Sequence, residues 1–424
     1  MNGKVARVLL ASGLIFLAGC SPEHILKSEN ALTTVVLQDR NGFSETVSQS
    51  DRLSRLEGVD FLSPQPYERV IRVFQRRDDG SVPSVLSCYY PNGQISELLD
   101  VVSGRAYGRY SRWHPNGQKQ LEAIVMGGIA DVTDRAKQTW LFDGESQVWD
   151  SEGRRIAFIP YEKGALHGQE EHYFPSGAMK ERRPHFKGQL HGVCELFTES
   201  GELLQRQEYE FGQPHGKSEA WWLREHRLSA NELWSRGALL QGEYFLPDGT
   251  LVGQVQQGSG ERVLFENGRV HRRYQVQAGQ VDGLIEEFSP SGLLTRSWCE
   301  TQGLRQGLER VYDAKNGRLK LELSWKDDIL QGPCRSYYPD GRLESQRECS
   351  DNQIEGRCVA WYPSGQLMLL EDYQQGLLDR GEYYELGSLV PVSQVVQRHG
   401  TVTLYDASGR KTRSVPIVNG VPAP

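Results

Sequence analysis

Short apolar and aromatic segments alternate with glycine-containing turns along most of the chain. The string aromatic-Pro-x-Gly occurs at Tyr90, Phe174, Tyr338 and Tyr362, and looser copies recur at steps close to 24 residues. The turn glycines of the clearest copies are Gly93, Gly117, Gly177, Gly201, Gly249, Gly292, Gly341 and Gly365. Segments of about seven residues between such turns are typical of strands joined as hairpins. Glycine suits the turns because it adopts positive φ without steric cost.

A second glycine series, out of phase with the first, predicts the opposite turn of each hairpin. It begins with the pairs Gly164-x-x-x-Gly168 and Gly188-x-x-x-Gly192, again about 24 residues apart. A hairpin of this size cannot bury a face alone, so neighbouring hairpins must stack. We therefore expect an all-β protein, an elongated antiparallel β-hairpin repeat array over residues 85–410.

Mostly aliphatic residues recur two places after the first-series glycine, and we expect them to form a core column. They are Ile95, Met179, Leu203, Leu251, Val270, Leu294, Leu319, Leu343 and Leu367.

Three regions depart from the period. Residues 31–84 predict a small N-terminal cap, with a hairpin of 33–38 and 45–48, a short helix over 51–56 capped by Ser50, and a strand over 69–76. An insertion near 126–142 can form a helical turn or remain a solvated loop. Residues 411–424 contain proline and are expected to form a C-terminal tail.

The first twenty residues carry a targeting pattern. Lys4 and Arg7 precede a mostly apolar stretch over 8–17, which is too short to span a bilayer. The stretch ends in Leu-Ala-Gly-Cys at Cys20, which resembles the lipobox of bacterial lipoproteins; the alternative is an ordinary signal peptide with an incidental cysteine. The resemblance implies a signal peptide over 1–19, lipidation of Cys20 and a linker over 20–30. Because Ser21 follows Cys20, it also implies a lipid-anchored protein of the bacterial cell envelope, sorted to the outer membrane.

The repeat itself resembles a known family. The run YYPDGRL at 337–343, with GQLHG at 188–192 as the opposite turn, is similar to the bacterial variant of the MORN repeat. The resemblance covers roughly residues 90–409. Such repeats occur in proteins labelled antitoxins of toxin–antitoxin systems, and MORN repeats are sometimes proposed to bind phospholipids.

Composition and charge narrow the function. The chain has 424 residues with 45 glycines and a net charge of −7, which becomes more negative when Lys4 and Arg7 are removed. An acidic body disfavours binding to nucleic acid and to anionic membranes. We found no nucleophile elbow, Walker loop or dinucleotide fingerprint in the sequence, so we expect no enzyme and no cofactor.

Three histidines are candidate metal ligands. His167, His191 and His215 recur every 24 residues, but equivalent positions lie two strands, about 9.5 Å, apart. A single zinc needs ligand atoms about 2 Å away, so we expect polar turn residues and no metal.

The densest basic cluster suggests either of two roles. It consists of Lys180, Arg182, Arg183 and Lys187, interrupted by Glu181. It can be a patch for phosphate or a lipid headgroup, or a solvated strand face.

Two cysteines flank one predicted turn, Cys349 and Cys358. One hypothesis is that they form a local disulfide; the alternative is that the cysteines are scattered small strand residues.

These observations favour a non-catalytic lipoprotein that binds an unknown protein partner or acts as a scaffold through its repeat surface, held to the membrane by its N-terminal lipid. One alternative is a phospholipid- or envelope-glycan-binding protein. Another is an antitoxin-like neutraliser of a partner protein.

Overall fold

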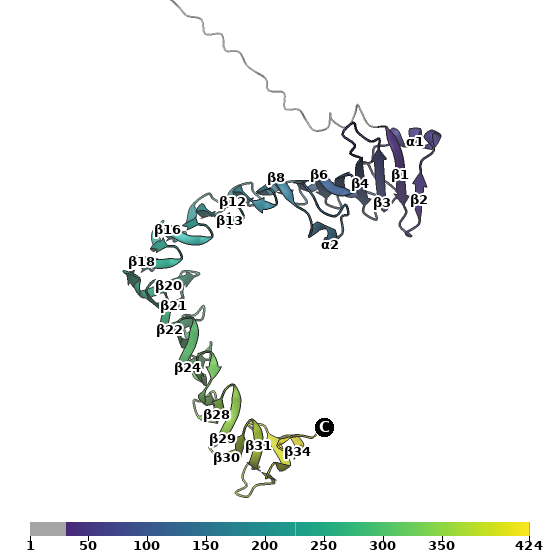
Figure 1. Cartoon of the computed structure of the whole chain (residues 1–424). Helices are drawn as coiled ribbons and strands as arrows, with labels where there is room; N and C mark the ends of the chain where they lie inside the picture. Colours follow the sequence, from purple (N-terminus) through teal and green to yellow (C-terminus); the bar gives the residue numbers. More distant parts are fainter. Residues whose placement is uncertain (1–30, 225, 424) are drawn as a thin grey trace, which may run out of the picture. The chain divides into compact units, whose positions relative to one another are not determined.

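The computed structural model describes residues 31–224 and 226–423 (Figure 1). Nearly all of the regular structure in these residues is antiparallel β-sheet, with two short helices, so the predicted all-β fold of hairpin-like strands is confirmed. The described residues form two compact units, one up to Gly177 and one from Ala178 onward. The predicted signal peptide, the lipidation site Cys20 and the linker to residue 30 lie outside the described residues.

The first unit contains eleven strands and both helices. Their bounds are β1 Leu32–Gln38, β2 Ser44–Val47, α1 Ser50–Glu57, β3 Arg69–Phe74, β4 Pro83–Tyr89, β5 Ile95–Val102, β6 Arg105–Trp113, β7 Lys119–Val125, α2 Asp134–Lys137, β8 Phe142–Trp149, β9 Arg155–Glu162, β10 Ala165–Leu166 and β11 Gly168–Tyr173.

The cap is joined directly to the repeats. Strand β1 pairs with β2 on one side and β3 on the other, and β3 then pairs with β4, the first strand of the repeat region. The expected helix is α1, but Ser50 does not cap it. Because Ser50 is already helical, Gln49 is the N-cap residue. The Gln49 side chain makes no capping hydrogen bond.

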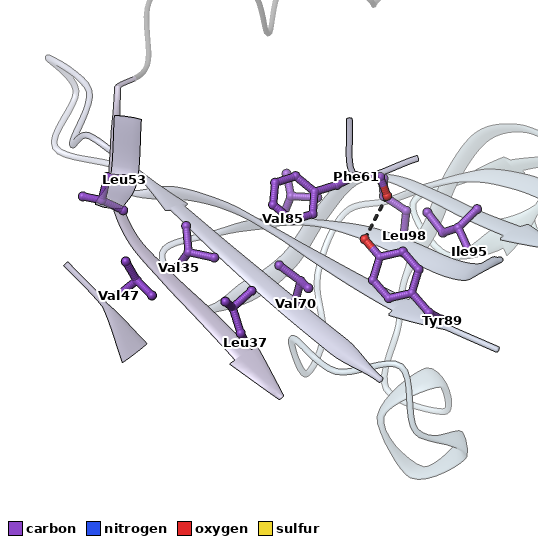
Figure 2. Packing of buried hydrophobic residues seen from close by; sticks show 10 residues of the cluster. All are labelled: Val35, Leu37, Val47, Leu53, Phe61, Val70, Val85, Tyr89, Ile95 and Leu98. Carbon is purple, nitrogen blue, oxygen red and sulfur yellow. Dashed lines mark hydrogen bonds between the residues drawn. The ribbon is translucent and has the colours of Figure 1, made fainter. Parts of the chain in front are cut away.

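The cap has an apolar core, which Figure 2 shows. Val35, Val47 and Val70 are almost completely buried, and Leu53 from α1 packs with them. The Tyr89 hydroxyl donates a 2.8 Å hydrogen bond to the carbonyl of Phe61, so the one polar atom of this buried ring has a partner.

The insertion forms a short helix. Strands β7 and β8 are joined by α2, whose N-cap Thr133 accepts a bond from the Ala136 amide. Trp140, 6% exposed, follows the helix, and its indole N–H donates to the Ile129 carbonyl at 2.8 Å. The insertion therefore packs onto the sheet.

The second unit continues the hairpins. Its strands are β12 Met179–Phe186, β13 Gln189–Leu190, β14 Gly192–Phe197, β15 Leu203–Glu210, β16 Gln213–Trp221, β17 Leu228–Ser235, β18 Ala238–Phe245, β19 Leu251–Gln256, β20 Ser259–Glu266, β21 Arg269–Gln277, β22 Gln280–Phe288, β23 Leu294–Thr301, β24 Leu304–Tyr312, β25 Leu319–Lys326, β26 Ile329–Leu330, β27 Gly332–Tyr337, β28 Leu343–Ser350, β29 Gln353–Trp361, β30 Leu367–Gln374, β31 Leu377–Tyr383, β32 Ser393–Val396, β33 His399–Tyr405, β34 Lys411–Val418 and β35 Val421–Pro422.

The two glycines of each Gly-x-x-x-Gly string have different roles. The first, as at Gly212, is the second residue of a two-residue turn in which the preceding residue, Phe211, also has positive φ. That combination is the type I′ hairpin turn. The second, as at Gly216, lies where the pairing of β15 with β16 shifts register, which is the position of a β-bulge.

Two expectations about the repeat region are wrong. Residues 411–424 were expected to be a tail, but β34 pairs with β33 and β35 pairs with β34, because Asn419 and Gly420 form another turn with positive φ. The aliphatic column is also not uniformly core: Ile95 is 3% exposed, whereas Leu251 is 48% exposed.

Candidate functional site

The eight predicted turn glycines all lie at tight turns. Their φ angles fall between +84° at Gly117 and +92° at Gly341. At Gly341 the amide donates to the Tyr338 carbonyl at 2.8 Å, and the Tyr338 amide donates to the Arg342 carbonyl at 2.8 Å. This is a three-residue hairpin loop closed by a bulge, for which glycine is the preferred residue. The glycines therefore set the repeat and do not form a binding site.

The tyrosines that open three of these turns tie one repeat to the next. The Tyr338 hydroxyl donates to the Trp361 carbonyl, and the Tyr362 hydroxyl donates to the Tyr384 carbonyl, each at 2.7 Å. In the first unit, the Tyr90 hydroxyl donates to the Trp113 carbonyl at 2.7 Å. These three tyrosines thus hydrogen-bond neighbouring repeats to each other.

Buried carboxylates are the chemistry that the sequence pattern did not reveal. Glu232, 5% exposed, accepts hydrogen bonds from the Tyr244 hydroxyl at 2.7 Å and the Trp234 indole at 2.9 Å, and it pairs with the Arg262 guanidinium at 2.7 Å. Its partners satisfy the buried charge, as a buried ion requires. Glu232 is opposite Gly242 on the next strand, two residues before Tyr244, so the signal that could have revealed it is a Glu opposite a Gly-x-Tyr string.

Glu371 has a different environment. It is 8% exposed and accepts hydrogen bonds from the hydroxyls of Tyr383 at 2.7 Å and Tyr373 at 3.2 Å. Burial raises the pKa of Glu371, and the hydrogen bonds from Tyr383, Tyr373 and Cys358 offset part of that effect. A carboxyl with a raised pKa is a feature of functional sites and of structural networks alike. Here the groups around it are those that hold strands β29, β30 and β31 together.

The predicted disulfide is not formed. Cys349 and Cys358 are both free thiols, and a register shift in the pairing of β28 with β29 sets Cys349 opposite Ile354 and Cys358 opposite Arg347. Cys349 instead meets Cys334 across the hairpin of β27 and β28, with the two sulfur atoms 3.5 Å apart and both residues buried.

Both arginines of the basic cluster pair with carboxylates. Arg182 pairs with Glu195 at 3.0 Å, directly opposite on β14, and Arg183 pairs with Glu181 at 2.6 Å. This arrangement favours the structural interpretation of the two arginines over a phosphate patch.

The three histidines do not converge on a metal. His167 pairs with Glu162 at 3.2 Å, and His215 pairs with Glu210 at 3.5 Å, each across its own turn. Within residues 31–224 and 226–423 there is no group of three or more His, Cys, Asp or Glu side chains arranged to hold a metal ion.

His191 lies instead in a cluster of exposed rings. Its imidazole centroid is 4.9 Å from the ring centroid of Phe211 and 5.8 Å from that of Phe186, and the two phenylalanine centroids are 6.4 Å apart. Phe211 is 54% exposed and Phe186 is 37% exposed. We call these three residues the aromatic cluster.

Strands β12 to β15 position the aromatic cluster. Phe186 ends β12, His191 lies between β13 and β14, and Phe211 is in the turn after β15. The Gly212 amide donates to the Leu190 carbonyl at 2.8 Å, which fixes the Phe211 turn beside His191. Leu190 also lines a groove of about 290 Å³ together with Leu196 and Tyr209. Sequence reasoning found His191 but missed both phenylalanines.

Comparisons with known proteins do not assign the chain to a family. No family model and no curated protein matches the chain. Among solved structures, the crystal structure of TcdB2-TccC3-TEV is 10% identical over 90% of this chain, and TcdB2-TccC3 without its hypervariable C-terminal region is 11% identical over 83%. Both have a TM-score of only 0.15, and the chain spans 24% of the length of each.

The fold therefore defines a class only: an all-β protein of antiparallel hairpin repeats. No helix in the part of the chain that the structure describes is long and apolar enough to cross a membrane.

Proposed function

We propose that this protein is a non-catalytic lipoprotein of the bacterial cell envelope that binds a partner protein through its repeat surface. The observation that supports the proposal best is the aromatic cluster, because Phe186 at the end of β12 and Phe211 in a turn expose apolar rings beside each other. Exposed aromatic side chains that gather in one place are typical of the centres of protein interfaces. The buried glutamates, in contrast, have partners that hold strands together.

The anchor part of this proposal is supported by the sequence around Cys20 alone. A thioether lipid with further acyl chains would hold the protein firmly at a membrane, since several acyl chains together bind far more tightly than one. The chain would then present its repeats to proteins of the envelope.

Two experiments test the proposal. A photoreactive amino acid at position 211, introduced into the full-length lipoprotein in cells, should form a covalent adduct with one protein. The same residue at position 302, which is the equivalent turn position of another hairpin, is the control and should not give that adduct. Adducts with lipid alone would instead favour the phospholipid-binding alternative.

For the anchor, Cys20→Ala should move the protein from the membrane fraction to the soluble fraction. Full retention of this variant on membranes would rule out the lipid anchor.

A further inference from the structure

The aromatic cluster differs from the neighbouring repeats at two positions, Phe186 and Phe211. In the hairpins on either side, a glutamate stands five residues before the histidine and pairs with it, as Glu162 with His167 and Glu210 with His215. In the hairpin between them, Phe186 occupies the position of the glutamate and His191 that of the histidine. A ring therefore contacts the imidazole where the neighbouring repeats have a carboxylate.

The second departure is in the turn. The first position of the two-residue turns, at 24- or 25-residue steps, holds Lys163, Lys187, Phe211 and Arg236, all with φ between +47° and +50°. Three of the four carry a long basic side chain. A bulky ring at positive φ is unusual, since this conformation favours Gly, Asn and Asp. Phe211 is exposed there, so packing into a core does not account for it.

Both departures meet at one place. Phe186 and Phe211 come from consecutive hairpins, yet each has its ring centroid within 6 Å of that of His191, at 5.8 Å and 4.9 Å. The rings are tilted against each other by 45° to 69°, so they form an uneven surface and not a flat stack. Such a surface suits one large apolar side chain, branched or aromatic.

The charge beside the cluster is positive. The Lys187 ammonium lies 5.2 Å from the Phe186 ring centroid, whereas Arg182 and Arg183 of the same segment pair with Glu195 and Glu181. The whole chain has a net charge of −7. A local basic site on an acidic protein favours acidic partners that dock at this site. Elsewhere on the surface the like charges repel such a partner.

We infer that Phe186, His191, Phe211 and Lys187 bind an acidic peptide segment of a partner protein that carries one large apolar side chain. The apolar side chain packs on the three rings, which removes their exposed area from water. Carboxylates of the segment pair with the Lys187 ammonium and approach the His191 imidazole. This inference rests on the proposed function and adds the chemistry of the partner to it.

The test uses fluorescent peptides and the purified full chain carrying Cys20→Ala. One peptide of about ten residues alternates Glu and Ser around a central Trp; three control peptides replace the Trp by Ser, every Glu by Gln, or every Glu by Lys. Fluorescence anisotropy should show binding of the first peptide about tenfold tighter than of any control peptide. Equal binding of all four peptides, tightest binding of the lysine peptide, or binding of none would overturn the inference.

Two variants restore the ordinary repeat at this place. Phe186→Glu supplies the carboxylate found in the neighbouring repeats, and Phe211→Asn supplies a residue that tolerates positive φ. Each should weaken binding of the Trp peptide about tenfold without lowering the midpoint of thermal unfolding. The matched control Gln302→Asn, at the same turn position of a distant hairpin, should leave binding unchanged, and the inference fails if Phe211→Asn does so too.

Two further probes separate this inference from the proposed function. Vesicles of anionic phospholipid and a neutral oligosaccharide should not compete with the Trp peptide, and competition by either one would replace the peptide with that ligand class. If position 211 crosslinks to a protein in cells while the acidic peptide does not bind, the proposed function stands and the partner chemistry is wrong.

Discussion

The sulfur atoms of Cys334 and Cys349 lie 3.5 Å apart in the hairpin of β27 and β28. We predict that these two thiols, and not Cys349 with Cys358, form a disulfide when the protein meets a disulfide reagent such as oxidised glutathione. One thiolate attacks the reagent and releases one reduced glutathione; the second thiolate then displaces the other, so two thiols become one disulfide and the reagent takes up both electrons. Burial raises the pKa of Cys349 to about 11, so the exchange should be slow in the folded protein.

Peptide mapping by mass spectrometry without reduction checks this pairing. The Cys358→Ser variant should keep the 334–349 link, and Cys334→Ser should lose it. A dominant link between Cys349 and Cys358 would contradict the prediction.

Removing one hydroxyl should weaken the contact between two repeats. Tyr362 is 1% exposed and its hydroxyl donates to the Tyr384 carbonyl at 2.7 Å. Tyr362→Phe leaves that carbonyl without this partner and should lower the free energy of unfolding by about 1–2 kcal/mol. Urea denaturation measures the change. Tyr107→Phe, at a tyrosine that is 50% exposed, is the control and should have little effect.

The pH dependence of stability should reveal Glu371. Burial raises its pKa in the folded state, so the folded protein binds this proton more tightly than the unfolded chain. Glu371 therefore destabilises the fold when charged, and this cost disappears as the pH falls through the raised pKa toward the ordinary value of about 4.3. We predict that Glu371→Gln gains stability relative to the native protein at pH 8 compared with pH 5, as measured by chemical denaturation.

Glu322 is the counterpart with the opposite sign. Burial opposes its charged form, but hydrogen bonds from Tyr337 and Arg310 outweigh burial and lower its pKa. Its contribution is present above the ordinary pKa of about 4.3 and is lost as the pH falls through the lowered value. Glu322→Gln should therefore be destabilising at pH 5 and at pH 8 alike. The same pH trend in both variants would show that the Glu371 effect is not specific.

The turn glycines should be sensitive to a single methyl group. Gly341 has φ +92°, and an added Cβ meets nothing within 4 Å, so the cost of Gly341→Ala is conformational alone. An L-residue at such an angle costs about 1–2 kcal/mol. Gly58 has φ −85° and equally open space, so Gly58→Ala is the matched control and should be close to neutral. Thermal unfolding of both variants measures the difference.

The backbone pattern of this protein could be predicted from sequence because turns impose local rules. Gly341 and its equivalents have the positive φ that their spacing indicated, and the strands between them pair as neighbours. The end of the array was missed since Asn419-Gly420 closes one more hairpin after the recognisable repeats stop. Ser50 failed as a cap because a one-residue change in where a helix begins moves the capping position.

Contacts between strands were harder to predict. Bulges such as the one between Arg347 and Cys349 change which residues face each other. Spacing along the sequence therefore suggested Cys358 as the partner of Cys349, whereas the nearby thiol is that of Cys334. The aromatic cluster was missed for a similar reason, since Phe186 and Phe211 are 25 residues apart in sequence and become neighbours only through the stacking of their hairpins.

The hydrogen bonds from Tyr338 to Trp361 and from Tyr362 to Tyr384 have a consequence for how such a chain can change in evolution. Each joint uses the same donor on one hairpin and the same acceptor on the next. Duplicating or deleting one whole period leaves every joint with a matching partner, whereas losing a single residue inside a period leaves two joints unmatched. Where such joints link two hairpins, the chain can therefore change length by a whole hairpin more readily than by a single residue.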